Sequence, residues 1–309
     1  MLRGPLQAGD LLAGRYALVD PVAPSGDAVL WRAQDEVLAR QVAVRLLPAG
    51  TKAARAAAEP FLAAAARASQ VSHPGLVRVL DAGVETRPGR AADVAYLVRE
   101  WVDGEPLDEH LAEVGALSAL DATDVLRQVA DALTAAHRGG LVHGRVHPGN
   151  VLVCPNGRVR LTDAAVAAAL SGTPVDGEAG DTRDAAAVLY ALLTCRWPAG
   201  ATPQPGGKLP AAPVAHGNPL ATHQVRAGVP LALDRVVSRG LAPGRVPALP
   251  ALATPSALAD AADQATAAER LERTAPAAPK PPAGYVVMPA GSPSPPSCWW
   301  RRWSAGSPG

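Results

Sequence analysis

Residues 141–163 read LVHGRVHPGNVLVCPNGRVRLTD, and this stretch decides the fold. The apolar run Val151–Val153 and the alternating run Arg158–Leu161 are joined by a Pro-Asn-Gly turn. Two short apolar runs around such a polar turn are typical of a β-hairpin. Asn150 and Asp163 stand at the two open ends of this hairpin, so we expect them to lie close enough to share a metal ion.

The loop before the hairpin and the residue after it carry a recognisable set of side chains. The stretch resembles the catalytic loop and metal-binding strand of the eukaryotic-type Ser/Thr protein kinases, H-R-D-L-x-x-x-N followed by D-F-G. His143, Pro148, Asn150 and Asp163 match this pattern. The resemblance implies an α+β, bilobal fold: a small antiparallel β-sheet N-lobe with one helix and a mainly helical C-lobe. The residues alone establish no cofactor, whereas the resemblance points to ATP and to Mg²⁺ held by Asn150 and Asp163.

The residues that depart from the pattern are those that carry out catalysis in the family. Gly144 replaces the arginine, Arg145 replaces the catalytic aspartate, and Ala164-Ala165 replace Phe-Gly. A guanidinium stays protonated and cannot take a proton from a substrate hydroxyl. We therefore expect no catalytic residue in this loop, and we interpret His143 as a buried structural residue.

Two further positions of the resemblance are also changed. The third of three alternating runs that predict an antiparallel meander ends in Arg45, where the family has a lysine. The glutamate that pairs with this lysine in active kinases falls on Ala64 of the following predicted helix. Arginine is not a conservative replacement for a buried lysine. The Lys–Glu ion pair of active kinases is therefore expected to be missing.

The positions that would contact a nucleotide are only partly kept. The turn between the first two strands retains one glycine, Gly26, where a glycine-rich lid would cover the phosphates, and we interpret it as an ordinary hairpin turn. The segment 100–104 resembles the hinge whose backbone holds adenine, with Glu100 and Val102 as the contact positions. Because these contacts come from the backbone, changes of side chain do not remove them.

The rest of the chain supplies the lobes and an extended end. We expect an N-lobe over 1–103, a C-lobe over 104–273 and a Pro-rich linker with a disordered tail over 274–309. A fourth and a fifth strand are predicted over 76–81 and 94–101, and helices over 53–70, 107–113, 118–138, 231–241 and 255–271. Asp181 is expected to start the central C-lobe helix as its N-cap and to anchor the backbone of the catalytic loop.

The net charge, the apolar runs and the cysteines limit where the protein is expected to lie and what it is expected to bind. A net charge of +1 gives no field for attracting nucleic acid, and no apolar run approaches the length of a transmembrane span. Three cysteines form no metal-type pair, which favours a reducing cytoplasm. The tryptophan- and arginine-rich stretch 298–303 leaves open a peripheral membrane contact, a floppy tail or an out-of-frame terminus.

The combination resembles the actinobacterial pseudokinases, most closely the pseudokinase domain of the mycobacterial MviN lipid II flippase. That resemblance implies an upstream Ser/Thr kinase, a forkhead-associated (FHA) domain protein and a cell-wall flippase as partners. FHA domains read a phosphothreonine together with the residue three positions later. Thr173, with Asp176 after it, is therefore the candidate phosphosite, and a plain turn threonine is the alternative.

Three functions stay open at this point. The first is a catalytically inactive kinase fold that works as a phosphorylation-dependent scaffold or regulator, in cell-wall synthesis if the resemblance holds. The second is an atypical or weakly active ATP-dependent Ser/Thr kinase that uses Asp163 and Asn150, with Arg45 in place of lysine. The third is a module that binds ATP without turnover.

Overall fold

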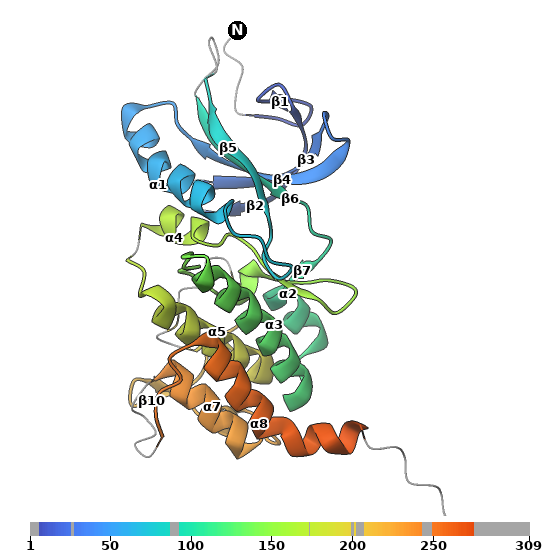
Figure 1. The fold of residues 1–309 in the computed structure, drawn as a ribbon, viewed down its shortest axis with the longest axis vertical. Coiled ribbons are helices and arrows are strands. Elements are labelled where there is room, and N and C mark those ends of the chain that lie inside the picture. Colours follow the sequence, from blue (N-terminus) through green and yellow to red (C-terminus); the bar gives the residue numbers. More distant parts are fainter. Residues whose placement is uncertain are drawn as a thin grey trace, which may run out of the picture.

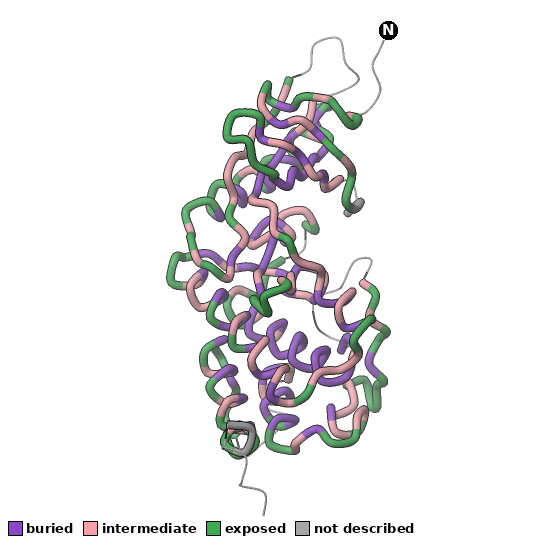
Figure 2. Tube along the Cα trace, turned by 90° about the vertical axis from the view of Figure 1, so that its right-hand side faces the viewer, coloured by how far each residue is buried: buried purple, intermediate pink, exposed green. Residues whose placement is uncertain are grey.

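The computed structural model describes residues 6–25, 28–86, 93–172, 174–198, 201, 207–242 and 249–274. These residues form two lobes, a sheet-rich one and a helical one, joined by the segment 101–104 (Figure 1). Buried residues run through the middle of both lobes (Figure 2). The predicted bilobal architecture is therefore confirmed, while the tail after Thr274 lies outside the described residues.

The N-lobe is a six-stranded antiparallel sheet in the order β1-β2-β3-β4-β6-β5. Its strands are β1 Leu11–Leu12, β2 Tyr16–Ser25, β3 Ala28–Asp35, β4 Arg40–Pro48, β5 Val79–Glu85 and β6 Val94–Glu100. The strands are rich in β-branched and aromatic residues, which favour a pleated surface packed on one or both faces.

The two faces of this sheet pack against different apolar clusters. Val44 in β4 and Val98 in β6 pair across the strands and point into a separate apolar cluster that includes Tyr16 and Trp31. The residues before and after each of these valines point the opposite way, toward helix α1 and the C-lobe, because side chains alternate along a strand. Arg45 lies on this second face, where most of its neighbours belong to the main core.

Helix α1, Lys52–Ala68, covers this second face of the sheet (Figure 1). It begins where the Thr51 hydroxyl accepts a hydrogen bond from the Ala54 N–H at 3.0 Å, which is an N-cap contact. Its buried side consists of alanines and Phe61. Small side chains let the helix lie close to the sheet, and they offer no polar group to it.

The C-lobe is built around one buried helix, α5 Gly177–Thr194. Every residue from Ala185 to Leu193 is essentially inaccessible to solvent. The other helices are α2 Leu107–Val114, α3 Ala119–Arg138, α4 Val166–Ser171, α6 Thr222–Val225, α7 Leu231–Leu241 and α8 Pro255–Thr274. The short strands are β7 Glu105–Pro106, β8 Val151–Val153, β9 Val159–Leu161, β10 Val214–Ala215 and β11 Asn218–Pro219, and a 3₁₀ turn spans Pro148–Asn150.

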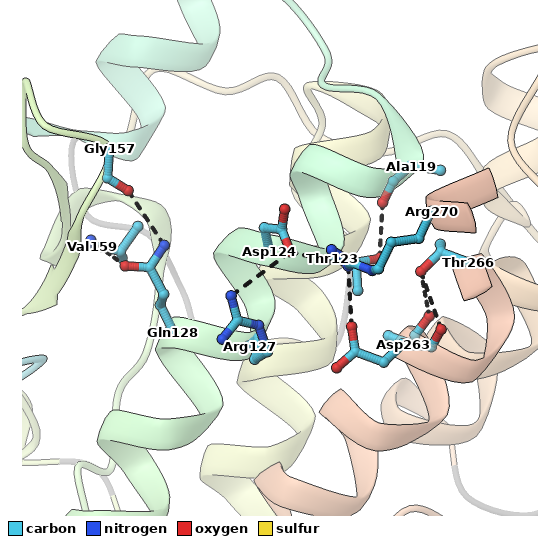
Figure 3. A network of polar contacts seen from close by, with 11 residues as sticks. Ala119, Thr123, Asp124, Arg127, Gln128, Gly157, Val159, Asp263, Thr266 and Arg270 are labelled. Atoms are coloured by element: carbon cyan, nitrogen blue, oxygen red, sulfur yellow. Dashed lines mark hydrogen bonds and ion pairs between the residues drawn. The ribbon is translucent and has the colours of Figure 1, made fainter. Parts of the chain in front are cut away.

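Helix α3 holds two other parts of the lobe by polar contacts (Figure 3). Arg270 of α8 donates to the carboxylates of Asp124 at 3.0 Å and Asp263 at 3.2 Å, and this ties α8 to α3. Gln128 accepts the Val159 N–H at 2.9 Å and donates to the carbonyl of Gly157 at 3.3 Å. The β8–β9 hairpin is thereby fixed on α3.

Several sequence predictions are confirmed and three need correction. The hairpin of β8 and β9 and the helix over 231–241 occur as predicted. The fourth predicted strand, 76–81, begins three residues later as β5. The prediction of Asp181 as an N-cap is wrong, because α5 already begins at Gly177 and places Asp181 inside the helix. Helix α4 was not predicted, and it packs beneath α1.

The closest approach between the C-lobe helices gives a stability prediction. A Cβ placed on Gly240 of α7 would lie 2.5 Å from the Cβ of Ala186 in α5 and 3.1 Å from Cδ1 of Leu258. Gly→Ala in a helix normally stabilises by about 1 kcal/mol. We expect Gly240→Ala to destabilise instead, by about 1–3 kcal/mol of unfolding free energy, because overpacking outweighs propensity.

Urea denaturation of the single and double variants measures this effect. Adding Ala186→Gly to Gly240→Ala removes the clashing methyl group, so the double variant should be more stable than the sum of the two single changes predicts. Strict additivity of the two losses would contradict close packing at this point.

Candidate functional site

The loop between α3 and β8 is held from below by two aspartates of α5. The buried carboxylate of Asp181 accepts the backbone N–H groups of His143 at 2.8 Å and Gly144 at 2.7 Å. Asp184, one turn further along the same helix face, accepts the N–H of Val146 at 3.1 Å. The loop backbone therefore keeps a fixed shape through contacts that do not involve its side chains.

His137 and His143 complete this anchor. His137 Nε2 lies 2.7 Å from Oδ2 of Asp181. His143 is fully buried, and its Nε2 donates to the carbonyl of Thr162 at 3.2 Å. Burial lowers the pKa of His143, so its ring is neutral at physiological pH. These contacts place His143 in a structural position between the loop and the strand β9.

Three further polar residues of the loop are Arg145, His147 and Asn150. Nδ2 of Asn150 donates to the carbonyl of Arg145 at 2.5 Å, and Oδ1 accepts the N–H of His147 at 3.0 Å. Burial, followed by the charges of His143 and Arg145, lowers the pKa of His147 to about 4. The Asn150 amide is thus engaged within the loop, and the position of the family's proton-accepting aspartate is filled by the buried Arg145.

Asp163 lies at the centre of the cleft, between two arginines of the sheet. Nη2 of Arg45 donates to Oδ2 of Asp163 at 2.6 Å, and Nη1 of Arg99 donates to Oδ1 at 2.9 Å. Arg45 comes from β4 and Arg99 from β6, so the two arginines belong to one lobe and the aspartate to the other. Both carboxylate oxygens of Asp163 are therefore occupied by cationic donors.

The three side chains are almost completely shielded from solvent. They are 8% exposed for Arg45, 9% for Arg99 and 10% for Asp163. Burial alone would raise the pKa of the Asp163 carboxyl, but the charges of Arg45 and Arg99 outweigh it and hold this pKa below its usual range. Burial and the charge of Arg99 lower the pKa of Arg45, while Asp163 opposes them. The group is an ionised, buried charge cluster.

Helix α1 contributes no acid to this cluster. Ala64 is fully buried on the face of α1 that packs on the sheet, as are Phe61 and Ala65. Glu59 of α1 is exposed. Arg45 therefore finds its carboxylate in Asp163 rather than in the helix.

A divalent metal does not fit this arrangement. Mg²⁺ needs free oxygen ligands in near-octahedral geometry, and a metal at Asp163 would have to displace both guanidinium groups. Within the part of the chain that the structure describes, no group of three or more His, Cys, Asp or Glu side chains is arranged to hold a metal ion. Asn150 and Asp163 are neighbours, since the Thr162 N–H donates to the Asn150 carbonyl at 3.0 Å, but their polar groups have other partners.

The structure describes two of the three predicted nucleotide positions, Glu100 and Val102. The side chain of Glu100 accepts the N–H of Arg78 at 2.7 Å and pairs with Arg160 of β9, so it forms a second ionic contact between the N-lobe sheet and the C-lobe. Val102 lies partly buried in the segment between the lobes, and Gly26 lies outside the described residues. The cavity that Arg99 and Asp163 line measures about 10 Å³, room for roughly one water molecule, and it lies toward α1 and β5 rather than at Glu100 and Val102.

Gly144 is required by its backbone and by its neighbours. Its φ is +81°, in the region that favours glycine, and an added Cβ would lie 2.6 Å from Cγ1 of Val175 and 2.9 Å from the Cβ of Ala168. The segment after Asp163 thus folds back over the loop. Thr173, the candidate phosphosite, lies outside the described residues, between Gly172 and Pro174.

Arg99 and α4 are the parts of the site that sequence reasoning missed. Arg99 ends an otherwise apolar run, VAYLV, in which each position is predicted to be buried on one face or the other. A charge at such a position requires a buried partner. An arginine at the end of an apolar strand therefore indicates a buried ion pair, although it does not identify Asp163 as the partner.

Comparison with known proteins agrees with the fold and the loop. The family model described as protein tyrosine and serine/threonine kinase matches residues 27–185. The serine/threonine-protein kinase PknA of Mycobacterium tuberculosis is 40% identical over 169 residues, which are 55% of this chain and 39% of that protein. The serine/threonine-protein kinase PrkC of Bacillus subtilis is 30% identical over 167 residues, 54% of this chain and 25% of that protein. The chain therefore spans well under half the length of these relatives.

A solved structure supports the same architecture. The PknI kinase domain of M. tuberculosis superimposes with a TM-score of 0.64, covering 85% of this chain and 100% of that domain at 24% identity. At this identity the similarity concerns the fold alone. Together with the family match over half of the sequence, these findings show that the chain belongs to the eukaryotic-type Ser/Thr protein kinase family.

Proposed function

We propose that this protein is a pseudokinase: a kinase-fold domain that transfers no phosphate and acts as a phosphorylation-dependent scaffold or regulator in the cytoplasm. The observation that carries the proposal is the engagement of both Asp163 carboxylate oxygens by Arg45 and Arg99. The carboxylate that would bind the metal–nucleotide complex is used as an internal ion-pair partner instead.

The chemistry of phosphoryl transfer supports this reading. Transfer needs a metal to neutralise charge and a carboxylate to orient and deprotonate the hydroxyl. Arg145 supplies a fixed positive charge where that carboxylate would act, and general-base help is worth about 10²–10⁴-fold in rate. Loss of the base together with loss of the metal ligand removes two separate contributions to the rate.

The scaffold part of the proposal follows from what the fold keeps. Asp181 and Asp184 hold the loop backbone although no catalytic side chain is left on it. Such anchoring preserves the shape of the loop between α3 and β8. We propose that an upstream Ser/Thr kinase phosphorylates Thr173 and that an FHA-domain protein then binds it, with regulation of a cell-wall flippase as the pathway that the MviN resemblance suggests.

The second candidate is a weakly active Ser/Thr kinase. Its support is the 40% identity with PknA, which is named a serine/threonine-protein kinase. In that case the lobes must open so that Asp163 leaves both arginines and binds Mg²⁺ with Asn150. Arg45 would then take the role of the lysine.

Phosphate transfer distinguishes the two candidates. We expect purified full-length protein to transfer no ³²P from Mg²⁺- or Mn²⁺-ATP to itself or to a general protein substrate above the level of the Asp163→Ala variant. PknA serves as the positive control in the same assay. Transfer that Asp163→Ala abolishes would establish the kinase and remove the pseudokinase proposal.

Reinstalling the base alone should not restore activity. Arg145→Asp supplies the missing carboxylate, but Asp163 remains held by Arg45 and Arg99. We expect this variant to stay at the background of the same ³²P assay. Activity comparable to PknA in Arg145→Asp would show that the metal site is functional, contrary to the proposed role of the clamp.

Binding of an FHA protein tests the scaffold role. After treatment with PknA, which here serves as the phosphorylating enzyme, we expect an immobilised FHA domain to retain the wild type and not the Thr173→Ala variant. Ser171→Ala is the matched control, because it removes a neighbouring hydroxyl. Equal retention of Thr173→Ala and wild type would reject Thr173 as the recognised site.

A further inference from the structure

We propose that Arg45, Arg99 and Asp163 form an internal ionic latch that closes the two lobes on each other without nucleotide or metal, and that Arg99 is the residue that keeps nucleotide out of the cleft. This inference rests on the proposed pseudokinase function and deepens it. It states how the inactive domain holds one arrangement of its lobes.

The latch joins the lobes directly. Both guanidinium groups are on the face of the N-lobe sheet that looks toward the C-lobe, and the carboxylate follows strand β9 of the C-lobe. The contacts, at 2.6 and 2.9 Å, are charge-assisted hydrogen bonds. Any opening of the cleft at this point separates Asp163 from both partners at once.

Burial makes this separation costly. Each side chain of the cluster is at least nine-tenths shielded from solvent, so water does not screen the attraction. The cluster contains two cations and one anion. Nε of Arg45 has no hydrogen-bond partner among the described residues. If Asp163 left, two positive charges would face each other inside the cleft.

Arg99 lies near the end of β6, where the N-lobe sheet borders the cleft. It immediately precedes Glu100 and the segment that joins the lobes, and it points at Asp163. The cavity that it lines has a volume of about 10 Å³. That cavity lies toward Ala68 of α1 and Val79 of β5, and none of the residues 100–104 borders it. The guanidinium of Arg99 itself reaches from the end of β6, next to the inter-lobe segment, to Asp163.

A surface ion pair on the same sheet face offers a matched control. Arg32 of β3 contacts Asp20 of β2 through two hydrogen bonds, of 2.8 and 3.3 Å. The two side chains are 37% and 50% exposed, and both belong to the N-lobe. Asp20→Asn breaks this two-contact Arg–Asp interaction within the N-lobe and leaves Arg32 in place, whose guanidinium lies 6.0 Å from the ring centroid of Trp101 in the inter-lobe segment.

The first experiment measures stability and lobe separation in the full-length chain. Asp163→Asn keeps the shape of the side chain and removes its charge, and we expect the Tm to fall by roughly 10 °C. Asp20→Asn should lower it by no more than about 2 °C. Both effects should be the same in EDTA and in Mg²⁺, because the latch uses no metal.

Distance measurements separate a latch from a merely structural ion pair. Spin labels at Val37→Cys in the N-lobe and Val114→Cys in the C-lobe, both at exposed positions, report the spacing of the lobes in a background without native cysteines. We expect one narrow distance distribution for the latch-intact protein and a longer, broader one for Asp163→Asn. Unchanged distances in Asp163→Asn would overturn the latch even if the Tm falls.

A second variant tests the exclusion of nucleotide and keeps Asp163 paired. Arg45→Lys combined with Arg99→Met leaves one cation for the carboxylate and removes the guanidinium that reaches from β6 to Asp163. We expect MgATP to raise the Tm of this double variant and to leave that of the wild type unchanged. A shift of the wild type by MgATP, or none in the double variant, would reject Arg99 as the excluding residue.

These outcomes are independent of the test of the proposed function. Unchanged lobe distances or the wrong response to MgATP would contradict the latch. Only phosphate transfer by the wild type would contradict the pseudokinase proposal. A protein with an open, nucleotide-binding cleft and no transfer would retain the proposed function and lose the latch.

Discussion

The carboxylate of Asp163 lies between two guanidinium groups, and this contact joins the two lobes inside the cleft. A buried carboxylate must be paired or neutralised, because isolated charge is strongly disfavoured inside a protein. Arg45 and Arg99 provide the pairing from the opposite lobe. Removal of one partner of such a buried pair typically costs about 3–5 kcal/mol. The interaction is thus large compared with the surface ion pairs elsewhere in the molecule.

This contact also explains why the neighbouring changes in sequence occur together. Ala64 can replace an acid in α1 because Arg45 no longer needs a partner there. Arg45 binds one carboxylate oxygen through Nη2 while Arg99 binds the other through Nη1. Helix α4 begins directly after Ala164 and Ala165 and packs against α1. The substitutions form one consistent alternative arrangement of the cleft.

Much of the fold could be predicted from local patterns, and much of the site could not. The β8–β9 hairpin and α7 follow from turn residues and apolar periodicity, which act over a few positions. Asp181 was correctly associated with the central helix, but its place inside α5 depends on the extra turn from Gly177, which polar residues disguise. Arg99 and Asp163 are 64 residues apart in the chain, so no local pattern joins them. Only the pairing of β4 with β6 and the docking of the lobes bring these charges together.

The loop anchored by α5 shows why the fold does not depend on the side chain at position 145. Asp181 and Asp184 bind backbone N–H groups, and every residue except proline supplies such a group. The shape of the loop is therefore insensitive to whether position 145 carries a carboxylate or a guanidinium. Selection on catalysis and selection on shape act on different atoms of the same segment. The backbone contacts of Asp181 and Asp184 therefore preserve the kinase fold of the loop with Arg145 at this position.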